Sequence, residues 1–263
     1  MFEGLADLPW WAPVLLCLAA LLAGWVDAVV GGGGLIQLPA LLLVPGFAPV
    51  HALATNKLGS VMGTLTSATT YYRRVRPDLR TTLPVAGVAF LGSMLGAVVA
   101  SHLPTSVFTP VVMVALVVVL VFTVARPRVG SDEEDTLPLP ATTLLLRTVP
   151  FGALVGFYDG VMGPGTGSFL VLGLAVLTRC TFLRASATAK IVNAATNLGA
   201  LAWFVPLGAV EWRLGVLIGV ANMLGGYLGA RTAVRLGSRF VRAVLIVVVS
   251  ALLLRLGYQE FAG

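Results

Sequence analysis

Two lysines and two aspartates are the residues of this 263-residue chain best suited to chemistry. The chain has only two lysines, Lys57 and Lys190, which are 133 residues apart. Asp27 and Asp159 are 132 residues apart, so each half of the chain has one acid followed by one lysine. All four lie within apolar sequence, where a retained charge is expensive and marks a functional site by default. The matched spacing indicates a duplication that carries its charged residues in both copies.

Each of these acids stands just before a glycine-rich stretch, Gly31 to Gly34 in the first half and Gly163 to Gly167 in the second. Glycine destabilises a helix by ~1 kcal/mol relative to alanine, and Pro164 removes a backbone donor as well. We therefore expect a break in the helix at both places. Non-helical backbone at membrane depth is tolerated only where it is buried in protein or lines a cavity. Helices that begin at these breaks would present free N–H groups to an anion, although small residues also serve plain helix packing.

The lysines lie on polar faces at helical spacing, together with Ser60, Thr64 and Ser67 in the first half and Ser186, Asn193 and Asn197 in the second. Three interpretations of the lysines remain open: contact with substrate, ion pairs with the two aspartates, and snorkelling to the membrane interface. The aspartates either anchor the broken backbone or accept protons in a coupled cycle. The candidate substrate-binding residues are Gly31, Gly32, Gly33, Gly34, Thr55, Asn56, Lys57, Gly163, Gly165, Thr166, Gly167, Lys190, Asn193 and Asn197, with Asp27 and Asp159 in a structural or proton-coupling role.

The composition places this site in a membrane. Hydrophobic residues make up 58% of the chain and charged residues only 11%, whereas about a quarter of a soluble domain is charged. Eight apolar stretches approach the ~20 residues that cross a bilayer, and two more are too short. We expect an all-α polytopic membrane protein with about eight full transmembrane helices and two short re-entrant or broken segments. The full spans are 11–30, 50–72, 81–100, 107–125, 144–162, 185–205, 214–230 and 240–256, and the short segments are 35–44 and 167–177.

The two halves should enter the membrane in opposite orientations, because each contains five segments. The first half is 1–125, a cytoplasmic linker with an acidic run follows at 126–142, and the second half is 143–263. Counting alternate crossings puts the arginine-rich connections, 73–80 and 231–242 among them, on one side, which the positive-inside rule makes cytoplasmic. Inverted repeats with broken segments are typical of secondary transporters. The expected location is the bacterial inner membrane.

The motifs around the breaks resemble those of the sulfite exporter TauE/SafE family of membrane permeases. The likeness rests on 27–39 with 54–57 in the first half, and on 156–169 with 187–197 in the second. It runs over nearly the whole chain and is closest to uncharacterised bacterial inner-membrane permeases. The resemblance implies export of sulfite or a small organosulfonate by alternating access at a midplane site. The implied partners are that anion and the bilayer, with no nucleic acid, and no cofactor or metal is expected because Cys17 and Cys180 lack ligand spacing.

Two alternative functions accompany this interpretation. A carrier of another solute, coupled to a cation or proton, would use Asp27 and Asp159. A membrane-embedded hydrolase is a remote alternative that would need Ser168 and Lys190 as a dyad, so we do not expect an enzyme. The small-residue faces at Gly92 with Gly96 and at Gly225 with Gly229 fit either a homodimer or close packing of the two halves.

Overall fold

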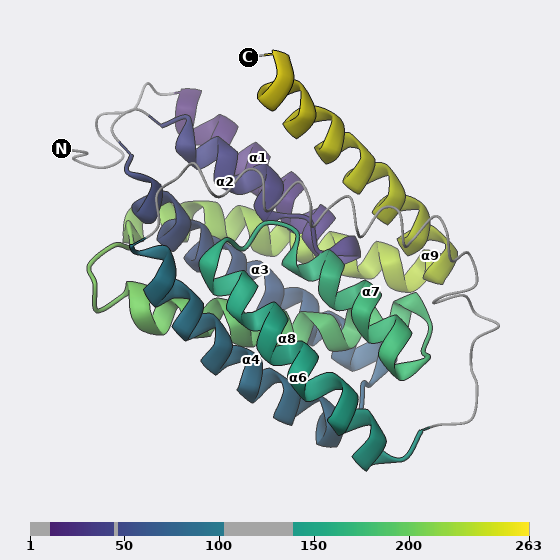
Figure 1. The fold of residues 1–263 in the computed structure, drawn as a ribbon. Coiled ribbons are helices and arrows are strands. Elements are labelled where there is room, and N and C mark those ends of the chain that lie inside the picture. Colours follow the sequence, from purple (N-terminus) through teal and green to yellow (C-terminus); the bar gives the residue numbers. More distant parts are fainter. Residues whose placement is uncertain (1–10, 45–46, 103–138, 263) are drawn as a thin grey trace.

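The structure is a computed structural model that describes residues 11–44, 47–102 and 139–262 (Figure 1). These residues form an all-helical body of eight helices, consistent with the predicted fold class. The predicted span 107–125 and most of the linker lie outside the described residues. The helices are α1 (Trp11–Val30), α2 (Gly34–Leu42), α3 (Pro49–Val75), α4 (Leu79–Ala100), α6 (Ala141–Val161), α7 (Thr166–Thr178), α8 (Phe182–Phe204) and α9 (Trp212–Ala262).

Four of the described helices are long and apolar enough to cross a membrane: Trp11–Val30, Leu79–Ala100, Ala141–Val161 and Trp212–Val248. The chain is a polytopic membrane protein. Within α9, Gly237 has φ 75° and ψ −170° and separates two helical stretches that run in different directions (Figure 1). These stretches contain the predicted spans 214–230 and 240–256.

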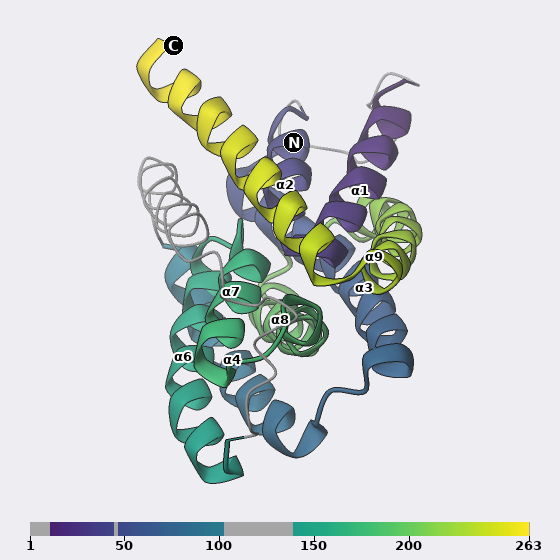
Figure 2. The same ribbon diagram turned by 90° about the vertical axis from the view of Figure 1, so that its right-hand side faces the viewer.

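The lysine-bearing helices α3 and α8 lie in the middle of the bundle. α8 is flanked by α4, α6 and α7 on one side and by α3 on the other (Figure 2). Most of the residues of α8 are buried, including its polar residues Ser186, Lys190, Asn193 and Asn197. The polar faces of the two central helices are therefore enclosed by the more apolar helices around them.

Both helix breaks occur at the glycine-rich stretches. α1 ends at Val30 and α2 begins at Gly34, whereas α6 ends at Val161 and α7 begins at Thr166. Gly31 and Gly163, which are equivalent in the duplication, share the same left-handed φ of 82°. A residue with a Cβ rarely adopts this conformation, so the local sequence accounts for where the two helices stop.

The two halves of the chain pack through the small-residue faces. A Cβ added to Gly92 or Gly96 of α4 would overlap the backbone of α6, and one added to Gly225 or Gly229 of α9 would overlap the backbone of α1. Each half thus lays its fourth segment against the first helix of the other half, as extensive contacts between α1 and α9 and between α4 and α6 also indicate. Because these faces are filled within one chain, they no longer argue for a homodimer.

Candidate functional site

The two lysines occupy equivalent positions on the central helices. Lys57 is eight residues from the start of α3 and Lys190 is eight residues from the start of α8. Both are enclosed, with relative exposures of 1% and 0%. Snorkelling to the membrane interface does not fit this geometry, because neither side chain leaves the protein interior.

Each lysine pairs with the aspartate of the other half. Lys57 Nζ lies 2.6 Å from Asp159 Oδ2 and also donates to the Asp159 backbone carbonyl at 2.7 Å. Lys190 Nζ lies 2.9 Å from Asp27 Oδ2. The ion-pair interpretation therefore agrees with the geometry, and the pairing is exchanged between the halves. Taking such charges out of water is costly unless they are paired. Each of the four charged residues therefore needs its partner to remain in the protein interior.

The two helix breaks meet beside these pairs. The backbones of Gly31 and Gly167 are in direct contact, and a Cβ on either glycine would overlap the other. A Cβ at Gly163 would lie 3.0 Å from Lys57 Nζ, so this glycine also leaves the room that the lysine occupies. Ser168 Oγ donates to the carbonyl of Val30 at 2.8 Å and ties the start of α7 to the end of α1. With Ser168 bonded there and Lys190 bonded to Asp27, the two residues do not form the dyad that a hydrolase would need.

A small cavity of ≈ 20 Å³ lies between the breaks and the polar faces. This volume holds about one water molecule and is too small for a polyatomic anion. In this structure the site is therefore closed to a larger solute. The cavity is lined by Asp27, Gly31, Gly34, Asn56, Lys57, Ser60, Asp159, Gly163, Thr166, Gly167, Asn193 and Asn197.

Most of the predicted site residues line this cavity, but Gly32, Gly33, Thr55, Gly165 and Lys190 do not. Lys190 forms an ion pair with Asp27, which does line the cavity. Thr55 points elsewhere: its Oγ1 accepts a hydrogen bond from the Glu211 backbone N–H at 3.1 Å and holds the start of α9.

Unsatisfied hydrogen-bonding groups face the closed site. Asn56 is 3% exposed, and its Oδ1 has no hydrogen-bond partner among the described residues. Within the same part of the chain, no partner is recorded for the backbone N–H groups of Gly34 and Gly167 at the starts of α2 and α7. Buried polar groups are nearly always bonded, so the buried Asn56 and Gly167 suit a site that binds a polar ligand.

Sequence reasoning missed one contact at the site. Ser93 of α4 donates to the Thr196 carbonyl at 2.7 Å and lies 3.5 Å from Asp159 Oδ2. Its position in the duplication corresponds to Gly226, so the repeat gave no signal for it. Ser60 was recognised on the polar face of α3 but was not included among the site residues, and it lines the cavity.

Comparison with known proteins agrees with this architecture. The sequence profile described as "Sulfite exporter TauE/SafE" matches residues 16–256. The chain belongs to the sulfite exporter TauE/SafE family. This TauE/SafE protein is 36% identical over 250 residues to the "Probable membrane transporter protein ORF9" of Sinorhizobium sp, an alignment that covers 95% of this chain and 94% of that one.

Two further relatives of this TauE/SafE protein are similar over their whole length. The "Probable membrane transporter protein YfcA" of Escherichia coli K12 is 31% identical, with 94% of this chain and 90% of that one covered. A "Probable membrane transporter protein" of Haemophilus influenzae is also 31% identical, with 94% of each chain covered. No solved structure matches the chain significantly. The protein is thus a multi-pass membrane transporter of a bacterial transporter family and not an enzyme.

Proposed function

We propose that this TauE/SafE protein exports a small sulfur-containing anion, sulfite or an organosulfonate, by alternating access at the site between its two halves. The observation that carries the proposal is the exchange of lysine–aspartate pairs across the halves, Lys57 with Asp159 and Lys190 with Asp27. Their position beside both helix breaks supports a substrate site there. The residues in contact with the anion are the cavity-lining residues together with Lys190.

The anion binds by competing with a carboxylate for a lysine. Each Lys Nζ is a compact charge that donates hydrogen bonds to oxygen atoms without fixing their geometry. In the closed state, the two lysines and two aspartates leave the site with no net formal charge. An arriving anion therefore replaces Asp27 or Asp159 at the ammonium group. The backbone N–H groups of Gly34 and Gly167 then donate hydrogen bonds to its remaining oxygens.

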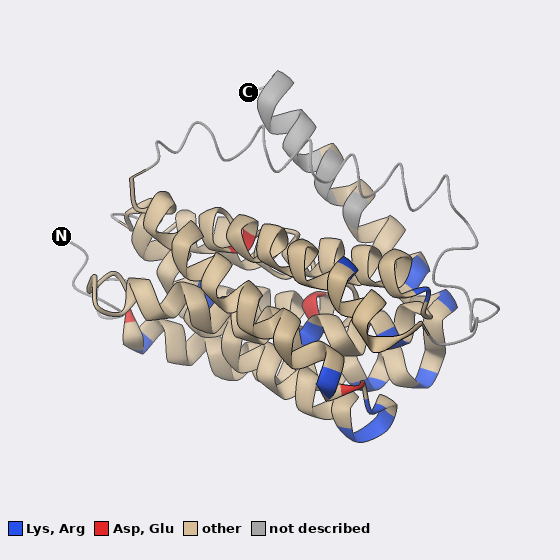
Figure 3. Cartoon of the chain, turned by 60° about the horizontal axis from the view of Figure 1, so that its bottom comes forward, with Lys and Arg blue, Asp and Glu red and all other residues tan. Residues whose placement is uncertain are grey.

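The two halves act as inverted repeats with about eight full spans, and α2 and α7 are re-entrant segments. The equivalent lysine positions, equivalent left-handed glycines and reciprocal packing of α4 and α9 support this arrangement. Most of the basic positions coloured in Figure 3 lie toward one end of the helical body, which we assign to the cytoplasmic face of the bacterial inner membrane. An inside-negative potential then favours anion export by ~2.3 kcal/mol per charge per 100 mV.

A second candidate function is proton coupling through the aspartates. Asp27 is favoured for this role because its side chain is 14% exposed, whereas that of Asp159 is 3% exposed. A proton on Asp27 would release Lys190 for the anion, so that proton and anion bind together. The corresponding alternative is that the protein carries another small solute, with a cation or proton bound at Asp27 and Asp159.

The test is the flux of labelled sulfite into liposomes containing the purified protein, under a membrane potential and separately under a pH gradient. Lys190→Ala is the site variant and Arg80→Gln, on an exposed side chain outside the site, is the control. Saturable flux that is lost in Lys190→Ala and retained in Arg80→Gln is expected. Normal flux in Lys190→Ala would reject the site, and folded protein without sulfite flux would reject this substrate. The gradient that drives the larger flux distinguishes uniport from proton coupling.

A further inference from the structure

A groove between α3 and α9 is separate from the closed site. It has a volume of ≈ 850 Å³. Four arginines line it, Arg73 and Arg74 from α3 and Arg231 and Arg235 from α9. All four are exposed, so their charges are presented to the groove and its surroundings rather than buried in the bundle.

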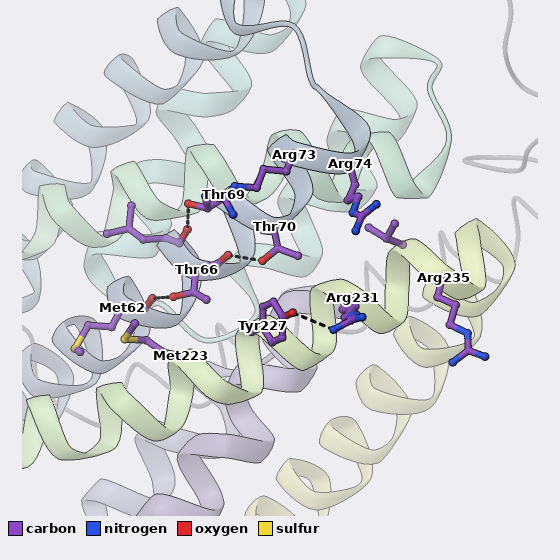
Figure 4. Close-up of a pocket in the computed structure, with 12 residues that line it drawn as sticks. Met62, Thr66, Thr69, Thr70, Arg73, Arg74, Met223, Tyr227, Arg231 and Arg235 are labelled. Carbon is purple, nitrogen blue, oxygen red and sulfur yellow. Dashed lines mark hydrogen bonds between the residues drawn. The ribbon is translucent and has the colours of Figure 1, made fainter.

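The described part of the chain gives these arginines no acidic partner. Among the described residues, no aspartate or glutamate forms an ion pair with any of the four. One protein contact orients Arg231, whose Nη1 donates to the Tyr227 hydroxyl at 3.0 Å and whose guanidinium lies 5.9 Å from the centre of that ring (Figure 4). An uncompensated cluster of four guanidinium groups favours an anionic ligand, above all a phosphate, which arginine binds with two parallel hydrogen bonds.

The lining changes in character along the groove. Met62 and Met223 lie at one end, Thr66 and Thr70 lie between, and the arginines lie at the other end (Figure 4). Twelve residues separate Met62 from Arg74 in a continuous helix, which is ~18 Å at 1.5 Å per residue. A free inorganic anion would use only the charged end. A phospholipid, with an anionic headgroup and an acyl chain, fits both ends.

The duplication provides an internal comparison. The positions equivalent to the four arginines are Pro206, Leu207, Val98 and His102, at the same 133-residue offset as the lysines. Thr66 corresponds to Gly199, where α8 touches the backbone of Phe90 in α4 so closely that a Cβ would overlap it. The equivalent helix pair, α8 and α4, thus packs in direct contact and without the arginines. Folding of the repeat does not require the charged groove.

We propose that the α3–α9 groove binds one anionic phospholipid, with the headgroup phosphate at the four arginines and an acyl chain along Met62, Leu65 and Met223. Basic pockets between transmembrane helices on the cytoplasmic side are suited to such headgroups. The groove lies at the arginine-rich end of α3 and in the middle of α9, two helices that pack on each other and contribute to the two halves. A bound lipid therefore contacts one helix from each half of the chain.

The test is native mass spectrometry of the detergent-purified full chain with phosphatidylglycerol and with phosphatidylcholine of the same acyl chains. Phosphatidylglycerol should remain bound, and Arg231→Gln with Arg235→Gln should lower its occupancy about tenfold or more. The matched control is Arg80→Gln with Arg239→Gln, which removes two exposed arginines outside the groove and should leave occupancy unchanged. Arg231→Lys with Arg235→Lys retains the charge and should restore most of the binding. If the glutamine variant does not fold, Arg73→Gln with Arg74→Gln replaces it, with the same expected loss.

A third arm distinguishes the source of the phosphate. Inorganic phosphate and sulfite at millimolar concentration should not displace phosphatidylglycerol. Displacement by either ion would make the groove a site for soluble anions and overturn the lipid assignment. Equal retention of phosphatidylcholine, or unchanged lipid occupancy in the glutamine variant, would overturn it as well. None of these outcomes depends on sulfite transport, so the proposed function and this site are tested separately.

Discussion

The ammonium group of Lys57 lies between the carboxylate and the backbone carbonyl of Asp159, at 2.6 and 2.7 Å. Asp159 is in the last turn of α6, which ends at Val161. Lys57 therefore neutralises the acid and also binds one of the carbonyls at the C-terminal end of that helix, where a cation is favoured. For Lys190 the corresponding recorded contact is with the Asp27 carboxylate alone. The two pairs are equivalent in position but differ in their hydrogen bonds, because in the described part of the chain only Lys57 also binds a backbone carbonyl.

The first prediction concerns the difference between the Lys57–Asp159 and Lys190–Asp27 pairs. Lys57→Met should reduce the free energy of unfolding by about 3–5 kcal/mol, because it leaves the Asp159 carboxylate buried without a partner. Lys190→Met should cost less, since Asp27 retains some contact with solvent. Thermal unfolding of both variants in the same detergent checks the order. A larger loss in Lys190→Met would contradict it.

The second prediction separates folding from transport. The double variant Lys57→Met with Asp159→Asn removes both charges of one pair, so it should recover most of the stability lost in Lys57→Met. Anion flux should remain low, because one of the two ammonium groups is still missing. Unfolding and liposome flux are measured on the same preparations. Recovery of flux along with stability would mean that the pair has only a structural role.

The third prediction concerns the contact of the two breaks. Gly31→Ala places a Cβ at a left-handed residue and against the backbone of Gly167, so it should strongly destabilise the protein. The matched control is Gly87→Ala in α4, where an added Cβ meets nothing within 4 Å. Because alanine is the better helix former, Gly87→Ala should raise stability by up to ~1 kcal/mol. Similar melting temperatures for the two variants would contradict the close contact between Gly31 and Gly167.

The fourth prediction tests the inverted orientation. In a background of Cys17→Ser and Cys180→Ser, single cysteines replace Asp78, before α4, and Gly208, before α9. These connections precede equivalent helices in the two halves, so inverted repeats put them on opposite sides of the membrane. A membrane-impermeant maleimide added to intact cells should label G208C and spare D78C. Labelling of both or of neither would reject the inversion.

Several features of the fold follow from local sequence. The helix breaks that contain Gly31 and Pro164 were predictable, because glycine and proline change the backbone preferences at their own positions. The apolar spans and the duplication are visible in composition and spacing alone. The candidate site was predicted in outline for the same reason, since the acids, glycines and lysines lie next to each other or at helical spacing within each half.

Only the tertiary structure decided how these pieces meet. Each half contains both an acid and a lysine, and spacing along the chain does not say that Lys57 pairs with Asp159 rather than with Asp27. That choice results from close packing of the glycine faces of α4 and α9 on the first helices of the opposite halves, which sets the position of each break relative to α3 and α8. The contact of Ser93 with Asp159, the closed cavity and the basic groove likewise join residues remote in sequence. Their geometry depends on how the helices pack, whereas the helix ends depend on the conformational preferences of single residues.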